Sequence, residues 1–147
     1  MAKRDYKGFM NLDYVHVKNV PAKVDKEFGY LISAQVMKQV ECKVAAAILL
    51  HPVPISGREV EFFRTILGLP QREFASLFKL SQVAILKWER EKSKRLSLAN
   101  EIAFRAIMAN ELGLGVRSSQ LVQSLEKSPK RLDVDFEINY EDLADAA

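Results

Sequence analysis

The segments Leu67-Gly-Leu-Pro-Gln-Arg-Glu-Phe-Ala75 and Leu80-Ser-Gln-Val-Ala-Ile-Leu-Lys-Trp-Glu89 carry the strongest structural signal in this chain. Gly68 can supply the left-handed residue that ends one helix, and Pro70 suits the start of the next. Ser81 is a suitable N-cap for a third helix, because its side-chain oxygen can accept a backbone N–H of the first turn. The two segments therefore predict short helices separated by tight turns.

The helix that ends at Gly68 has an equally clear beginning. Ser56-Gly-Arg-Glu59 is a capping box, in which serine and glutamate each satisfy a backbone N–H of the other. Apolar side chains at helical spacing are expected to form the core of these helices, namely Val60, Phe63, Ile66, Leu67, Phe74, Ala75, Phe78, Ile85 and Trp88. A longer helix that Gly113 can end is expected to bury Leu98, Ile102, Ile107 and Leu112.

The first fifty residues have a different pattern. Short β-rich runs between residues 12 and 24 are interrupted by Asn19 and Pro21, and a hairpin turning at residues 25–27 is plausible. A helix capped by Ser33 should then run to about Leu50, where prolines end it. The lone Cys42 on this helix is expected to be a buried small hydrophobic residue.

The chain after Pro129 returns to a strand pattern. A short helix is expected at Ser119–Leu125, and apolar and acidic residues then alternate strictly from Leu132 to Tyr140. This strand could pair with its own chain, a second subunit or another protein. The sequence thus predicts a mainly α protein: a five-helix domain at 55–128, preceded by a small β-hairpin plus helix at 1–54 and followed by an acidic strand and tail at 129–147.

Composition and charge narrow the functional class. The net charge of the chain is +3. Residues 132–147 carry −6, so the remaining residues together carry +9, which suits a polyanionic partner. No apolar run is long enough to cross a bilayer, and no secretory signal is present, so we expect a cytoplasmic protein. His16, His51 and Cys42 have no catalytic or ligand constellation around them, and no phosphate-binding glycine fingerprint exists. We expect no enzyme activity, cofactor or metal site.

The basic run from Lys87 to Arg95 directly follows the third predicted short helix. Short helices with tight turns and an adjoining basic run are what a helix-turn-helix needs to place one helix in the major groove of DNA. The alternative interpretation of such a run is an ordinary solvated face.

Residues 56–112 resemble the XRE/Cro family of helix-turn-helix repressors, through the two segments quoted above and their Trp-Glu pair. The family usually has glycine where Lys79 and Glu91 stand here. Either the turn differs or Lys79 takes a left-handed conformation at a cost of about 1 kcal/mol or more.

The resemblance implies roles for individual residues. Base contacts would come from Gln82, Val83 and Lys87. Backbone contacts would come from Gln71, Ser81, Arg90, Lys92, Lys94 and Arg95. Arg64 and Glu89 would form a structural pair, and Trp88 would belong to the core.

A closer resemblance is to MqsA-type antitoxins, through Ile55-Ser-Gly-Arg-Glu-Val-Glu-Phe-Phe-Arg64 and the lead-in Asp13–Pro21. Their N-terminal module often holds zinc through paired cysteines, which this chain lacks. The resemblance implies a homodimer that represses its own operon by binding operator DNA and that neutralises a toxin protein. The alternatives are a stand-alone or phage-type repressor, or a protein-interaction module whose DNA binding is secondary.

Overall fold

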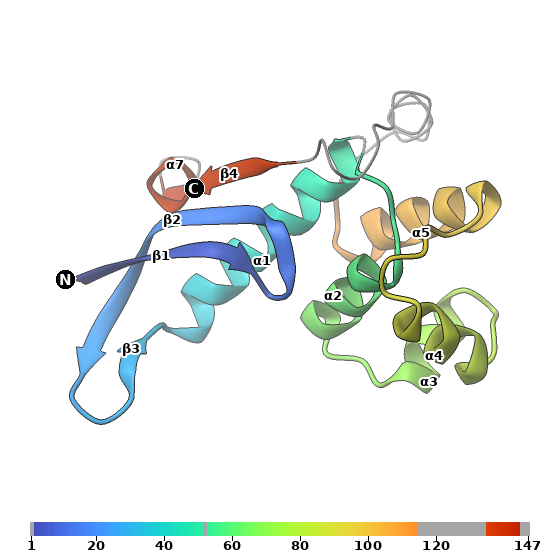
Figure 1. Cartoon of the computed structure of the whole chain (residues 1–147), viewed down its shortest axis with the longest axis horizontal. Helices are drawn as coiled ribbons and strands as arrows, with labels where there is room; N and C mark the ends of the chain where they lie inside the picture. Colours follow the sequence, from blue (N-terminus) through green and yellow to red (C-terminus); the bar gives the residue numbers. More distant parts are fainter. Residues whose placement is uncertain (1, 52, 115–134, 145–147) are drawn as a thin grey trace. The chain divides into compact units, whose positions relative to one another are not determined.

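The computed structural model describes residues 2–51, 53–114 and 135–144 (Figure 1). The chain divides into two compact units, Met1–Val44 with Asp135–Ala147 and Ala45–Val134. The first unit holds a mixed β-sheet and the second a group of helices. Helix α1, Ala34–Leu50, contributes residues to both units.

The sheet of the first unit is built around one long strand, β2, Leu12–Asp25. Strand β1, Ala2–Phe9, pairs with it in antiparallel fashion, and so does the short β3, Gly29–Leu31. Strand β4, Phe136–Asn139, pairs in parallel with Val15–Lys18 of β2. The predicted hairpin is confirmed, and its turn lies at residues 26–28, one residue later than expected, since Asp25 still pairs with Gly29.

Asn19 and Pro21 do not interrupt β2, for reasons of local geometry. Asn19 has a φ of +60° and donates its N–H to Asp5 Oδ1 at 2.9 Å, which accommodates a register shift against β1. Pro21 lies between the segments of β2 that pair with β4 and with β3. Pro21 lies opposite Lys3 of β1, and the pairing of β1 with β2 continues on both sides of this position, at Ala22 and at Val20.

The expectation of a mainly α, five-helix fold is wrong. The described residues form six helices and a four-stranded mixed sheet, so the protein is α/β. The sequence of strand β1 lacks an apolar residue at every second position, because its half-buried positions include Arg4 and Tyr6. The Arg4 guanidinium group stacks on the Tyr6 ring, with its carbon 4.4 Å from the ring centroid. A long side chain that covers a sheet with its aliphatic stem hides the strand pattern.

The acidic C-terminal strand pairs within its own chain. Ile138 is buried, and the rings of Tyr14 and Phe136 meet edge-on at 5.7 Å. Its carboxylates face basic partners: Asp135 lies 2.7 Å from His16 Nε2, and Glu137 lies 3.2 Å from Lys18 Nζ. Helix α7, Tyr140–Ala144, follows β4 directly. Residues 132–134 and the helix expected at Ser119–Leu125 lie outside the described residues.

Helix α1 begins as the sequence predicts, because Ser33 Oγ accepts the Val36 N–H at 3.2 Å. It ends at Leu50, also as predicted. The expectation for Cys42 is wrong: its side chain is exposed. No described helix has the length and apolarity that crossing a membrane requires.

The second unit contains α2, Gly57–Leu67, α3, Gln71–Leu77, α4, Gln82–Arg90, and α5, Leu98–Glu111. Phe104 of α5 lies in an aromatic cluster, with ring centroids 5.3 Å from Phe63 and 5.7 Å from Phe78. The predicted core face of α5 is wrong at Leu98 and Ile102, which are exposed, whereas Glu101 and Arg105 are fully buried. These two buried charges lie 3.5 Å apart and compensate each other.

Candidate nucleic-acid interface

The two turns that orient α3 and α4 are set by left-handed residues. Gly68 has a φ of +67° and donates its N–H to Thr65 O at 3.0 Å, which ends α2. Lys79 has a φ of +56° between α3 and α4, so this lysine takes the left-handed conformation. Ser81 then caps α4, its Oγ accepting the Ala84 N–H at 3.2 Å. The result is two short helices joined by four residues, Phe78–Ser81.

Helix α4 has one buried face and one exposed face. Ile85 and Glu89, one turn apart, are buried, and Trp88 is half-buried with its ring 6.2 Å from that of Phe78. A helix turns about 100° per residue. The opposite face therefore carries the exposed Val83, Lys87 and Arg90, and Gln82 is exposed because it is the first residue of the helix. Val83 is 72% exposed, which leaves its side chain free to contact a ligand.

Glu89 anchors α4 to α2 from behind. Arg64 Nε and Nη2 each donate to a Glu89 carboxylate oxygen at 2.8 Å, a bidentate pair. The Glu89 carboxylate raises the pKa of Arg64, through hydrogen bonding first and Coulomb attraction second. The structure thus brings together the two residues expected to form a structural pair.

Gln71, at the first position of α3, also reaches this pair. Its amide Nε2 donates to Glu89 Oε1 at 3.5 Å, and the side chain is half-buried. The residue expected at a DNA phosphate is therefore directed, in this structure, toward the ion pair. The backbone N–H of Gln71 lies at the N-terminus of α3, where a backbone group rather than the side chain could contact a phosphate.

Three cations of the basic run have carboxylate partners that sequence reasoning missed. Lys92 lies 3.8 Å from Glu61, Lys94 lies 3.6 Å from Glu91, and Arg95 lies 2.9 Å from the buried Glu101. Only the Lys94–Glu91 pair, three residues apart, has a spacing that a sequence could suggest. The other two depend on tertiary packing.

Lys87 and Arg90 differ from these three cations. Within the described residues the side chain of neither has a hydrogen-bond or ion-pair partner, and the same holds for the side chains of Arg72 and Lys79. Arg72, in α3, and Lys79, in the turn, were not predicted as contacts. Exposure and the absence of a compensating carboxylate make these four residues the freest positive charges of the α3–α4 region.

The loop after α4 is held in place by α2 and by the residues just before it. Leu96 N–H donates to Ile55 O at 2.8 Å, and Arg58 N–H donates to Lys92 O at 3.2 Å. Arg58 Nη2 also donates to Ser93 Oγ at 3.3 Å. The basic run is therefore fixed relative to α4. Among the described residues no group of three or more His, Cys, Asp or Glu side chains is placed to hold a metal ion.

Comparison with known protein families, with curated proteins and with solved structures finds no match for this chain.

Proposed function

We propose that this chain is a sequence-specific, double-stranded DNA-binding transcription regulator whose α4 enters the major groove. The observation that supports this most directly is the exposed surface of α4. Val83, Lys87 and Arg90 form its outer face, Gln82 is exposed at its first position, and Ile85 and Glu89 anchor the helix from behind. Gln can pair with adenine, valine can contact a thymine methyl, and lysine can donate to guanine O6 or N7.

The phosphate contacts follow from the ion pairs. Exposed salt bridges are worth only about 0–1 kcal/mol, so Lys92 and Lys94 can exchange their carboxylates for phosphates. Arg95 is less available for a phosphate, because moving it away would leave the buried Glu101 carboxylate with less compensating positive charge. Lys87 and Arg90 need to break no pair. We therefore rank Arg90, Lys92 and Lys94 above Arg95 as backbone contacts.

The base-reading assignment is tested with the double variant Gln82→Ala, Lys87→Ala. Binding of the DNA upstream of its own coding sequence and of a scrambled fragment is measured by fluorescence anisotropy. Each good base contact contributes about 1–3 kcal/mol of discrimination, so the loss of two contacts should lower the preference at least about 30-fold. Lys43→Ala, which removes an exposed lysine of α1, is the matched control. Wild-type preference in the double variant would refute the role of α4.

Salt dependence separates this proposal from a protein-interaction module. Phosphate contacts release counterions, so affinity should fall steeply with salt, with a log–log slope of roughly −0.9 per contact. Replacing Arg90 by Ala should make this slope shallower by about 1. If the chain does not bind DNA even at low salt, the proposal of a DNA-binding regulator is wrong.

A single helix-turn-helix contacts few base pairs, so we propose a homodimer in the cytoplasm on half-sites about one helical turn apart. The exposed Leu98 and Ile102 of α5 support this, since large apolar side chains on a helix surface favour a contact. Ile102→Arg should give a monomer in light scattering and weaken operator binding. A dimer that persists unchanged would exclude this face.

The antitoxin role rests only on the resemblance of Ile55–Arg64 and the lead-in strand. We propose it as the particular kind of regulator, with a toxin protein as partner. Co-purification with the product of a neighbouring small reading frame tests it. If no such frame exists, a stand-alone or phage-type repressor is favoured.

A further inference from the structure

The β2–β3 hairpin of the first unit exposes an unusual amount of apolar surface. Val24 is 68% exposed, Phe28 is 72% exposed, and Tyr30 and Leu31 are each nearly half exposed. All lie within eight residues of sequence. Clustered exposed hydrophobic side chains at one place mark interaction sites more often than scattered ones do.

The register of the hairpin assigns these side chains to two faces. Lys23 lies opposite Leu31 and Val24 lies opposite Tyr30, and directly paired residues share a face of the sheet. The Val24 face is partly covered, because the Arg4 guanidinium carbon lies 5.6 Å from the centroid of the Tyr30 ring. The Leu31 face is the more open one.

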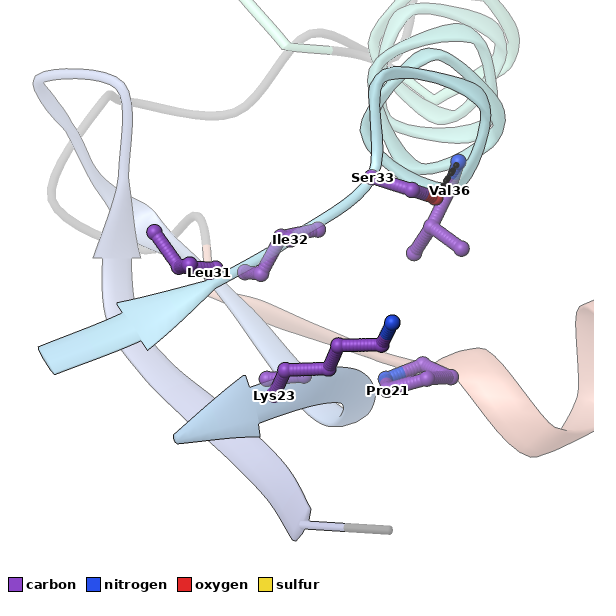
Figure 2. Close-up of a pocket in the computed structure, with 7 residues that line it drawn as sticks. Pro21, Lys23, Leu31, Ile32, Ser33 and Val36 are labelled. Atoms are coloured by element: carbon purple, nitrogen blue, oxygen red, sulfur yellow. Dashed lines mark hydrogen bonds between the residues drawn. The ribbon is translucent and has the colours of Figure 1, made fainter. Parts of the chain in front are cut away.

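A cavity of about 510 Å³ lies on the Leu31 face, between the end of β2, the segment after β3 and the start of α1 (Figure 2). Its apolar lining includes Leu31, Ile32 and Val36. Lys23 is the one charged lining residue, and Figure 2 shows its amino group extending toward Val36. A volume in this range accommodates bulky side chains or a small ligand.

The polar groups near this cavity are not equally available. Ser33 Oγ is engaged with the Val36 N–H, and the Asp25 carboxylate accepts the N–H groups of Glu27 and Phe28 at 2.7 and 2.9 Å. Those two bonds lower the pKa of Asp25. Lys23 has no ion-pair partner among the described residues. The cavity therefore offers an apolar wall and one uncompensated cation.

We propose that this face docks an extended segment of another protein that carries a large apolar residue two positions from an acidic one, so that both side chains point to the same face. The apolar side chain would enter the cavity, and the carboxylate would pair with Lys23. β3 is the outermost strand on its side of the hairpin, so the segment can add alongside it through backbone hydrogen bonds. A small molecule in the cavity would make no use of the outer edge of β3, whereas an extended protein segment can use both the cavity and this edge, which favours a protein segment.

The test uses the whole chain and two synthetic probe peptides of alternating Thr and Val. In each, a central Leu stands two positions from a Glu (the Leu-Glu peptide) or from a Lys (the Leu-Lys peptide). Calorimetry gives affinities, and amide NMR shifts give the location. We expect the Leu-Glu peptide to bind with shifts at residues 29–32. Lys23→Glu should weaken it about fivefold and reverse the preference toward the Leu-Lys peptide. Leu31→Asp should weaken binding about 30-fold, as removal of an interface anchor does.

Val24→Asp, on the other face of the hairpin, is the matched control and should leave binding unchanged. Thermal melts verify that each variant is folded, and the substituted side chains are all exposed. The proposal is overturned if neither peptide binds, if the shifts fall elsewhere, or if Lys23→Glu does not reverse the preference. Self-association that Leu31→Asp abolishes, without peptide binding, would assign the face to a second copy of this chain instead.

Discussion

Gly57 marks the closest approach between α2 and the end of α4. A Cβ at this position would lie 2.1 Å from the backbone oxygen of Trp88 and 2.9 Å from that of Glu91. Backbone atoms cannot yield as a flexible side chain can. Gly57→Ala should therefore lower the free energy of unfolding by about 3 kcal/mol, at the upper end of overpacking costs, in a chemical denaturation experiment.

Gly68→Ala is the matched control for this prediction. A methyl group at Gly68 would have no neighbouring atom within 4 Å, so this position needs only a left-handed backbone. Its replacement should cost about 1 kcal/mol. Equal losses at the two glycines would show that the contact with α4 is not tight.

The Arg64–Glu89 pair permits a double-mutant cycle. Glu89 is 7% exposed, so removing Arg64 leaves a buried carboxylate without its cation. Arg64→Met and Glu89→Met should each cost about 3 kcal/mol, while the double variant should cost less than their sum. Chemical denaturation of the four proteins gives the coupling energy. Additive losses would mean that the two side chains act independently.

Local signals at single residues predicted local structure well. The caps at Ser33 and Ser81 and the left-handed Gly68 depend only on neighbouring residues, and the structure shows all three. The carboxylate partners of Lys92 and Arg95 could not be predicted. Glu61 lies in another helix, so its distance from Lys92 depends on how the helices pack. Glu101 is fully buried, and a sequence gives no reason to expect a buried glutamate because glutamates are rarely buried.

At the scale of elements, Arg105 joins α5 to the end of α1. It is fully buried and donates to the carbonyls of Ile48 and Leu49 at 3.1 Å, and also to that of Val53. The last carbonyls of a helix lack intrahelical donors, and the prolines that follow α1 cannot supply N–H groups. Arg105 therefore satisfies acceptors that the local sequence leaves unpaired.

Arg105→Met should destabilise the second unit by about 3–5 kcal/mol, because it strands those carbonyls and leaves Glu101 with less positive charge. Hydrogen exchange should increase in the last turn of α1 and the first turns of α5. Asn110→Ala, an exposed change on the same helix, should have little effect. Unchanged exchange in α1 would mean that packing alone holds that turn.

Errors in predicting elements had one common cause. The sequence pattern assumes that apolar residues face the core, whereas α5 buries Glu101 and Arg105 and exposes Leu98. Strand β1 fails the same assumption, because Arg4 and Tyr6 occupy its half-buried positions. Where burial follows apolarity, as at Val40, Val44 and Ile48 of α1, the prediction and the structure agree.

At the scale of the whole molecule, the aromatic residues distinguish the two units. The chain has four tyrosines, at positions 6, 14, 30 and 140, all in the first unit, and its single tryptophan, Trp88, is in the second. Tyrosine circular dichroism and tryptophan fluorescence therefore report on different units. This allows their unfolding to be followed separately in the intact chain.

Strand β4 should stabilise the first unit alone. Ile138 is 7% exposed against β2, so Ile138→Asp removes buried apolar surface and places a carboxylate there, at a cost of about 3 kcal/mol or more. The tyrosine-detected transition should move to lower temperature while the transition reported by Trp88 stays in place. Glu137→Gln is an exposed change on the same strand that removes only the ion pair with Lys18. It should change the free energy of unfolding of neither unit by more than about 1 kcal/mol. If both transitions moved together, the units would unfold as one cooperative body, because loss of β4 could reach Trp88 only through coupling between them.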